Sequence, residues 1–253
     1  MVTPQPYAHD VAPGSWRPFG DAEDLDVDFA TDNRAALITS ILASCGEPRD
    51  AQHWWSQTLG SRIAAMLRLL AVTDAIDHLK LVAYCRQPSC AEPFEFELPL
   101  AILNDAVPDN GTVRVALDGV RSVSLRRPNG HDLNAWRSQR LESPEVAIAA
   151  MLKSLVVEGQ ATLEDASVLA EALSAEDPLV AFTLSCNCPA CGSPNEVSVD
   201  LEDVALSRLK QRQRMLLHEI HGLASHYGWT EAEVLAVAPS RRAQYLAMIE
   251  DQR

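Results

Sequence analysis

The most informative parts of the sequence are LVAYCRQPSCAEPFEFELPL at residues 81–100 and FTLSCNCPACGSPNEVSVDL at residues 182–201. The first contains a C-x4-C pair, and the second contains a C-x-C-x2-C triplet. The residues around these cysteines alternate between apolar and polar, a pattern typical of strands. Each stretch therefore predicts a β-hairpin with thiols at its turn, which is the form of a zinc knuckle.

The two stretches also resemble one another. When Cys90 is set over Cys191, the register holds for ten residues and places Cys85 over Cys186. Upstream, IAAMLRLL at 63–70 is echoed by IAAMLKSL at 148–155, with an extra segment around 162–175 in the second copy. We interpret this as an internal duplication of a helix-plus-knuckle unit.

Five thiols compete for the four positions of a tetrahedral site. The duplication favours Cys186 as a ligand, whereas the two-residue chelate favours its neighbour in the C-x2-C pair, because that spacing presets both sulfurs. The stronger argument is chelate geometry, and Cys186 is kept as a substitute. The predicted zinc ligands are Cys85, Cys90, Cys188 and Cys191.

The alternative interpretations of these cysteines are an iron–sulfur cluster, disulfides, or buried free thiols. Thiolates also bind iron–sulfur clusters, but the spacing favours closed structural zinc. A reducing cytoplasm disfavours disulfides. The isolated Cys45, at the end of LITSILASC, is interpreted as a core residue.

Composition excludes several classes of protein. The 253 residues carry 21 Lys+Arg against 35 Asp+Glu, a net charge of −14. This balance argues against a general nucleic-acid binder, which needs a basic face. No apolar run approaches the ~18 residues of a membrane span, and the first residues lack the pattern of a secretory signal. We expect a chain that is cytoplasmic when made and has no membrane partner.

Charge is distributed in blocks. Residues 1–33 hold seven acids, one base and four prolines, which predicts an acidic N-terminal arm that is disordered or bound to a partner. Trp16 favours partner binding over a merely solubilising tail. Residues 112–140 are rich in arginine, whereas 161–206 contain nine acids and no base. Such blocks suit contacts between subunits, although solvated faces are the default interpretation.

Periodicity predicts an α+β fold that is mainly helical, with small antiparallel hairpins. The duplicated body spans 34–201 and includes a hairpin at 112–127 around Asp118-Gly119. Helix caps are expected at Ser143, Thr230 and Ser240. A C-terminal helical docking segment spans 202–253. The expected helices are 34–45, 60–72, 133–140, 144–157, 162–175, 202–226 and two short helices at the C-terminus.

No catalytic motif is evident. His218 and His221 flank Glu219 at a spacing of i and i+3, whereas a zinc peptidase needs i and i+4. His226 follows on the same helix, and we interpret all three as a polar or packing stripe. An all-thiolate site also lacks the open position that hydrolysis needs. The sequence does not indicate an enzyme.

The C-terminal stretch LLHEIHGLASHYGWTEAEVLAVAPSRRAQYLAMI (216–249) resembles the end of the baseplate hub assembly chaperones of contractile-tailed phages. Related proteins of contractile injection systems are also similar upstream, in a C-P-x-C-G knuckle and an R-x-P-x-G-x-D-L turn. The resemblance extends over residues 60–250. The first knuckle departs from it, with C-x4-C in place of C-x2-C. The positions that carry the C-terminal motif are His221, Leu223, Ala224, Tyr227, Gly228, Trp229, Thr230, Glu231, Glu233, Val234, Leu235, Arg241, Arg242, Tyr245 and Leu246.

This resemblance implies a non-enzymatic component of a contractile tail baseplate, built into the hub or helping to assemble it. Its partners would be other hub proteins, in a hetero-oligomeric assembly, and it would stay cytoplasmic or enter a phage-like particle. The expected partner-binding residues are Tyr227, Trp229, Arg241, Arg242, Tyr245 and Trp16.

The rival hypothesis is a zinc-ribbon regulatory protein that binds nucleic acid through its C-terminal helices. Its phosphate contacts would come from Arg208, Lys210, Arg212, Arg214, Arg241 and Arg242.

Overall fold

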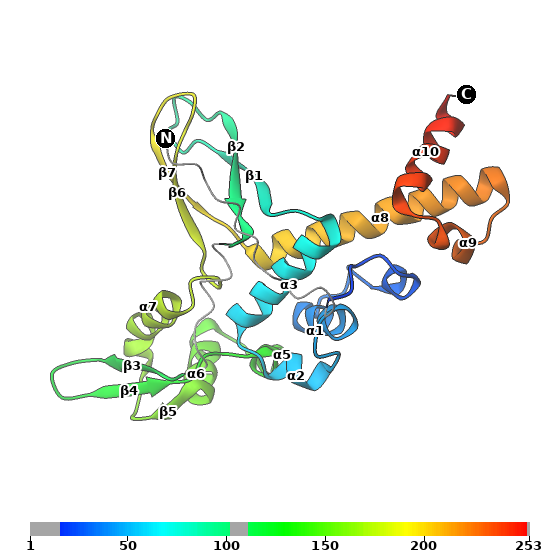
Figure 1. The fold of residues 1–253 in the computed structure, drawn as a ribbon. Helices are drawn as coiled ribbons and strands as arrows, with labels where there is room; N and C mark the ends of the chain where they lie inside the picture. The colour runs from blue at the N-terminus through cyan, green and yellow to red at the C-terminus, as the bar shows by residue number, and fades with distance from the viewer. Residues whose placement is uncertain (1–15, 102–110, 252–253) are drawn as a thin grey trace, which may run out of the picture.

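The computed structural model describes residues 16–101 and 111–251 (Figure 1). Helices predominate, and three small antiparallel sheets accompany them within these ranges. The α+β class and the two cysteine-bearing hairpins expected from the sequence are confirmed.

The elements follow in this order along the chain. The helices, with two 3-10 turns labelled η, are η1 (Ala22–Asp26), α1 (Arg34–Cys45), α2 (Ala51–Ser56), α3 (Leu59–Asp74), α5 (Gly130–Ser138), α6 (Pro144–Leu155), η2 (Leu163–Asp165), α7 (Ala166–Glu176), α8 (Leu201–Tyr227), α9 (Glu231–Ala236) and α10 (Pro239–Glu250). The strands are β1 (His78–Tyr84), β2 (Pro93–Pro99), β3 (Val113–Ala116), β4 (Ser122–Leu125), β5 (Val156–Glu158), β6 (Thr183–Asn187) and β7 (Pro194–Ser198).

The main hydrophobic core lies between α1, α3 and the first half of α8. Ile41, Met66 and Leu209, one from each helix, are fully buried there. At the centre of this core, Arg62 is 1% exposed and donates to the carbonyls of Ala35 and Trp54. A buried guanidinium is tolerated because its N–H groups find such acceptors.

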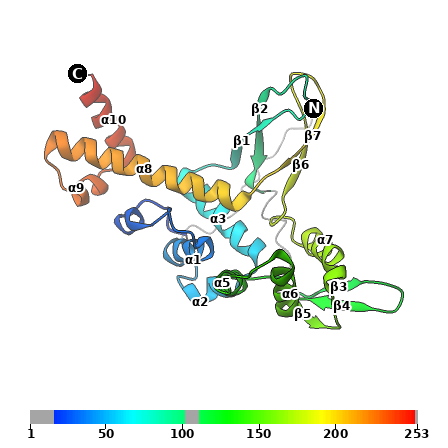
Figure 2. The ribbon, with the colours of Figure 1, turned by 180° about the vertical axis from the view of Figure 1, so that it is seen from behind.

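The two cysteine hairpins project side by side from this core (Figures 1 and 2). In β1–β2, Tyr84 pairs with Pro93, and in β6–β7, Asn187 pairs with Pro194. Each hairpin rises from the main core at its base, and its tip carries the cysteines. The tips have a small cluster of their own, in which Ala83, Phe94 and two of the cysteines are buried.

A second cluster forms a separate lobe, in which α6 and α7 pack with the sheet β3-β4-β5. The expected 112–127 hairpin is present. The helix predicted at 133–140 begins earlier, because Asn129 caps it and Asp132 is the third residue of a capping box. The helix predicted at 162–175 begins as the 3-10 turn η2.

The helical part of the sequence repeat is not repeated in space. IAAMLRLL lies in α3 within the main core, whereas IAAMLKSL lies in α6 within the second lobe. The duplication in space is therefore limited to the hairpins, because short apolar helices share sequence readily wherever they pack.

At the far end of α8, the chain turns back through α9 and α10 (Figure 1). Thr230 and Glu233 form the predicted capping box. The expected cap at Ser240 is wrong: α10 begins at Pro239, with Ala238 as its N-cap. Proline is favoured at the first helical position, where its missing N–H has no intrahelical partner to lose.

The sequence predicts an N-terminal arm over 1–33 that is disordered or bound to a partner. Its second half instead packs on the rest of the chain, and residues 1–15 lie outside the described ranges. Phe19 is 2% exposed in the main core. The Gln213 side chain on α8 donates to the carbonyls of Asp24, Leu25 and Val27. Residues 16–33 are thus fastened to the body of the protein.

Candidate metal centre

Four thiols meet where the tips of the two hairpins come together. Their sulfurs all lie within 4.8 Å of one another, and they belong to Cys85, Cys90, Cys188 and Cys191. The Sγ atoms of Cys85 and Cys191 are 3.6 Å apart, and those of Cys90 and Cys188 are 3.9 Å apart. These are the four cysteines that chelate spacing selects.

The distances fit a tetrahedral metal. With Zn–S bonds near 2.3 Å, the edges of a tetrahedron of sulfurs measure about 3.8 Å. Each hairpin supplies two sulfurs, and both short pairs cross from one hairpin to the other. A cation at the centre would therefore link two segments that lie about a hundred residues apart in the chain.

Backbone geometry explains how two different spacings make one site. The Cys85 N–H donates to the Glu92 carbonyl, and the Cys188 N–H donates to the Ser193 carbonyl, both at 2.9 Å. Strand pairing thus makes Cys85 equivalent to Cys188, not to Cys186 as the ungapped alignment suggests. The first turn contains two additional residues, which the alignment could not show.

The residues that follow the second cysteine of each turn are also equivalent. Ala91 and Gly192 both adopt left-handed backbone conformations, with φ of 50° and 73°. Glycine takes this conformation without cost, whereas alanine is unusual there. Both turns therefore reverse in the same way.

Cys186, the predicted substitute ligand, is not one of the four grouped thiols. It lies on β6 opposite Asn195 and packs, half-buried, against the small cluster at the tips. Cys45 is fully buried in the main core, where burial raises the pKa of its thiol to about 12. All six cysteines are free thiols.

Asn195 is a site residue that the sequence analysis missed. Its side chain is 3% exposed, and its Oδ1 accepts from the Arg86 N–H at 2.7 Å. Its Nδ2 lies 3.9 Å from Cys85 Sγ and donates to the Ser193 carbonyl. Asn195, on the second hairpin, therefore joins the two hairpins and contacts Cys85, a ligand of the first hairpin. Its position four residues after Cys191 is the only sequence signal for this role.

The pKa values of the grouped thiols differ widely. Hydrogen bonds from the Ser193 side chain and backbone lower the pKa of Cys191 to about 6. A backbone hydrogen bond from Glu92 favours the Cys90 thiolate, yet desolvation and the neighbouring thiols raise its pKa to about 12. Four thiolates this close repel one another, and a divalent cation would compensate that charge.

The C-terminal residues that carry the family resemblance form one packed unit. Tyr227 stacks on Trp229 with ring centroids 5.0 Å apart, and Tyr245 meets both rings edge-on. Arg242 is 4% exposed, and its Nε donates to Glu219 at 2.9 Å. Arg241, one residue earlier, is exposed. Of this predicted set, Arg242 is buried within the chain, whereas Arg241 is open to a partner.

Trp16 also packs within the chain. Its ring meets Trp54 edge-on at 5.9 Å, and the Arg68 guanidinium lies over it at 5.9 Å. The half-buried Trp16 therefore contacts the core within the chain, and its role in binding a partner stays a prediction.

The histidine stripe does not assemble into a metal site in the described part of the chain, where the four cysteines alone form such a group. His218, His221 and His226 line an open cavity of about 630 Å³ beside α10. This agrees with the interpretation of a polar stripe.

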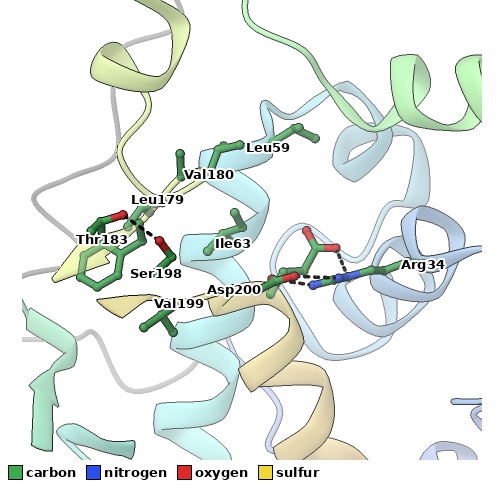
Figure 3. A pocket seen from close by; sticks show the side chains of 12 residues that line it. Arg34, Leu59, Ile63, Leu179, Val180, Thr183, Ser198, Val199 and Asp200 are labelled. Carbon is green, nitrogen blue, oxygen red and sulfur yellow. Dashed lines mark hydrogen bonds and ion pairs between the residues drawn. The ribbon is translucent and has the colours of Figure 1, made fainter. Parts of the chain in front are cut away.

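A further pocket of about 580 Å³ lies at the base of the β6–β7 hairpin (Figure 3). Apolar side chains such as Ile63 and Phe182 line it. At its rim Arg34 makes a two-pronged hydrogen bond to Asp200 and an ion pair of 2.6 Å with Glu202. These acids satisfy the arginine, so its charge is not free for an anion.

None of the described helices is both long and apolar enough to cross a membrane. No protein-family model matches this chain, and no curated protein or solved structure matches it at a significant level.

Proposed function

We propose that the chain is a non-enzymatic structural or assembly component of a contractile tail baseplate, with a structural zinc ion held by the four grouped cysteines. The observation that carries the metal part is the convergence of these thiols from two hairpins at tetrahedral distances. Sulfur ligands suit zinc, and four of them leave no position for a substrate or an activated water. The ion would act as a clamp.

A metal clamp is needed because the hairpin tips have little hydrophobic core of their own. The buried apolar residues of the cluster at the tips are Ala83, Phe94 and two of the cysteines. Such a small cluster contributes little stability, and small units of this kind depend on metals or disulfides. The metal would hold both hairpins in one arrangement as a rigid projection for a neighbouring subunit.

The baseplate part is carried by the resemblance of residues 216–249. Its support is that these residues form one unit at the end of α8, with stacked aromatics, a capping box and the ion pair of the buried Arg242 with Glu219. Such a unit can present a fixed surface to hub proteins. The exposed residues Tyr227 and Arg241 would contribute to that surface.

The nucleic-acid alternative finds less support. Arg242 is buried against Glu219, and Arg208 donates to the Lys80 carbonyl. Both would have to leave these partners to reach phosphate. The net charge of −14 also repels a polyanion.

The deciding experiment is quantitative mass spectrometry of purified contractile particles from the host that encodes the chain, beside a deletion strain. Stoichiometric presence identifies a structural baseplate subunit. Absence from particles combined with defective tails on deletion identifies an assembly chaperone. Absence with normal tails would refute the baseplate role. Zinc analysis of the purified chain tests the metal part separately.

A further inference from the structure

Helix α6 is far more apolar than its burial explains. Eight of its twelve residues are Val, Ala, Ile, Met or Leu, yet Leu155 is the only one that is buried. Surface helices of globular proteins normally keep such residues on the side that faces the core. An apolar outer side indicates a face that another surface covers.

The exposed face can be assigned from the contacts of the helix. Leu155 enters the core of the second lobe, and Ser154 accepts a hydrogen bond from the Trp136 indole at 3.1 Å, so this side faces inward. The opposite side, which we call the outer face of α6, carries the exposed residues Glu145, Val146, Ala149 and Lys153. Leu152 lies at the edge of this face and is half-buried, because it also packs against the core of the lobe. Val146 on this face is 50% exposed.

A groove runs along the outer face. It has a volume of about 550 Å³ and lies between Ala149 and Leu152 on α6 and Ala161 and Leu163 on the following segment. Leu163 is 48% exposed. The groove is open and mostly apolar, as are the grooves that take the apolar face of a partner helix.

The charges on the outer face are arranged symmetrically. Glu145 and Lys153 lie four residues before and four residues after Ala149, so all three share one side of the helix. When two copies of α6 pack antiparallel about a twofold axis at Ala149, Glu145 of each copy faces Lys153 of the other. Neither residue has an ion-pair partner within residues 16–101 and 111–251.

The same axis aligns the apolar residues. Val146 of one copy then lies opposite Leu152 of the other, beside the groove, and the small Ala149 permits close approach at the crossing. A twofold interface requires one patch that is complementary to itself. The outer face of α6 meets this requirement in the placement of its charges and of its apolar residues.

We propose that the outer face of α6 binds a second copy of this chain, forming a twofold dimer with reciprocal Glu145–Lys153 ion pairs. The inference is independent of the baseplate role and of the metal, since α6 contributes to neither the cysteine cluster nor the C-terminal unit.

The test is charge reversal followed by sedimentation velocity of the purified full chain. E145K alone and K153E alone each place like charges opposite one another twice, and should raise the dimer dissociation constant at least about tenfold. The double variant E145K/K153E should dimerise again. An equimolar mixture of the two single variants should form the heterodimer, because every facing pair is then of opposite sign.

A matched control is E95K, which makes the same change of charge on the exposed side of β2, away from α6. It should leave the dissociation constant unchanged. E145K places a positive charge near the N-terminus of α6, and K153E places a negative charge near its C-terminus, so each change opposes the helix dipole. The double variant carries both unfavourable changes and should have the least stable helix of the three. Recovery of the dimer therefore separates pairing from helix stability, which circular dichroism checks directly.

Three results would overturn the proposal. One is a wild-type chain that stays monomeric up to about 100 μM, too weak for a specific dimer. Another is a dimer that both single variants leave unchanged. The third is failure of both the mixture and the double variant to recover the dimer while their helix content stays native.

Discussion

Cys85 and Cys188 occupy the same position in two hairpins whose turns differ in length by two residues. Each is the first residue after a strand, and each donates its N–H across the turn at 2.9 Å. The second cysteine of each turn then lies before a residue with positive φ. A C-x4-C turn thereby presents its sulfurs as a C-x2-C turn does, and the two complete one tetrahedral set.

The first prediction concerns which thiols bind metal. The purified chain should contain one zinc per molecule, measured by plasma mass spectrometry. C188S removes a buried ligand and should abolish stoichiometric zinc, because three thiolates leave the ion open to water and chelators.

C186S is the matched control, since it makes the same change two residues earlier on β6. It should retain one zinc, because Cys186 is outside the group of four. Loss of zinc in C186S together with its retention in C188S would mean that the ungapped alignment, not strand pairing, gives the correct ligands.

The second prediction concerns metal removal. Stripping the ion with a chelator should free the hairpin tips while the helices persist, since the main core and the tips are separate clusters. Hydrogen exchange should rise in β1, β2, β6 and β7 near the turns and stay unchanged in α9 and α10. The unfolding temperature should fall by at least about 5 °C, because each kcal/mol is worth 2–4 °C at this size. Uniform loss of protection over the whole chain would contradict a local clamp.

The third prediction concerns Asn195. N195A removes the acceptor of the Arg86 N–H, a partly buried hydrogen bond whose loss should cost about 1 kcal/mol. It also removes a contact with Cys85, and loss of such supporting groups typically weakens metal binding about 10–100-fold. A competition titration with a colorimetric chelator measures the affinity. N187A, on the exposed neighbouring position of β6, is the control and should bind zinc normally.

The sequence predicted the parts of this structure that depend on local spacing. Helix α1 matches its expected bounds, and the cap at Ser143 and the capping box at Thr230 follow from neighbouring residues. Chelate spacing likewise identified the four grouped thiols. Each of these features depends on residues that lie close together in the sequence.

Features that depend on distant contacts could not be predicted. Nothing near Trp16 in sequence shows that Trp54 and Arg68 will enclose it. Gln213 looks like one polar residue in a basic stretch, yet it fastens residues 24–27 through three hydrogen bonds. The burial of Arg62 also has no local signature in the sequence, because the groups that accept its hydrogen bonds come from α1 and α2.

The fourth prediction separates two adjacent arginines. R242A removes an ion pair between the buried Arg242 and the half-buried Glu219, together with a hydrogen bond to the Val237 carbonyl, and should destabilise the chain by about 1.5–3 kcal/mol. R241A changes an exposed side chain and should stay within about 0.5 kcal/mol of wild type. Urea denaturation measures both.

R241A also addresses the nucleic-acid alternative. If the C-terminal helices bound phosphate, R241A would weaken duplex binding and reduce its dependence on salt. We expect no salt-dependent binding in the wild type. Steep salt-dependent binding that R241A reduces would favour the alternative.

The last prediction concerns the junction between residues 16–33 and the core, where Asp24 is 1% exposed. The Arg17 guanidinium bonds both of its carboxylate oxygens at 2.6 and 2.9 Å, and the N–H groups of Gly20 and Asp21 add two more bonds. Burial alone would raise the pKa of Asp24, but these donors outweigh it and hold the pKa below its usual value. The folded state therefore favours the ionised form.

Stability from this carboxylate is fully present above the unfolded pKa of about 3.9, and it is lost as the pH falls through the lower folded value. D24N should destabilise the chain by about 3 kcal/mol at pH 7, because it leaves the largely buried Arg17 with only the exposed Asp21 as an ion-pair partner among the described residues. The difference between D24N and wild type should shrink progressively below about pH 4. D21N, which alters an exposed partner of the same arginine, should cost no more than about 1 kcal/mol. Urea unfolding of the three proteins across this pH range checks the sign, and a D24N deficit that stays constant down to pH 3 would show that the carboxylate charge is not its source.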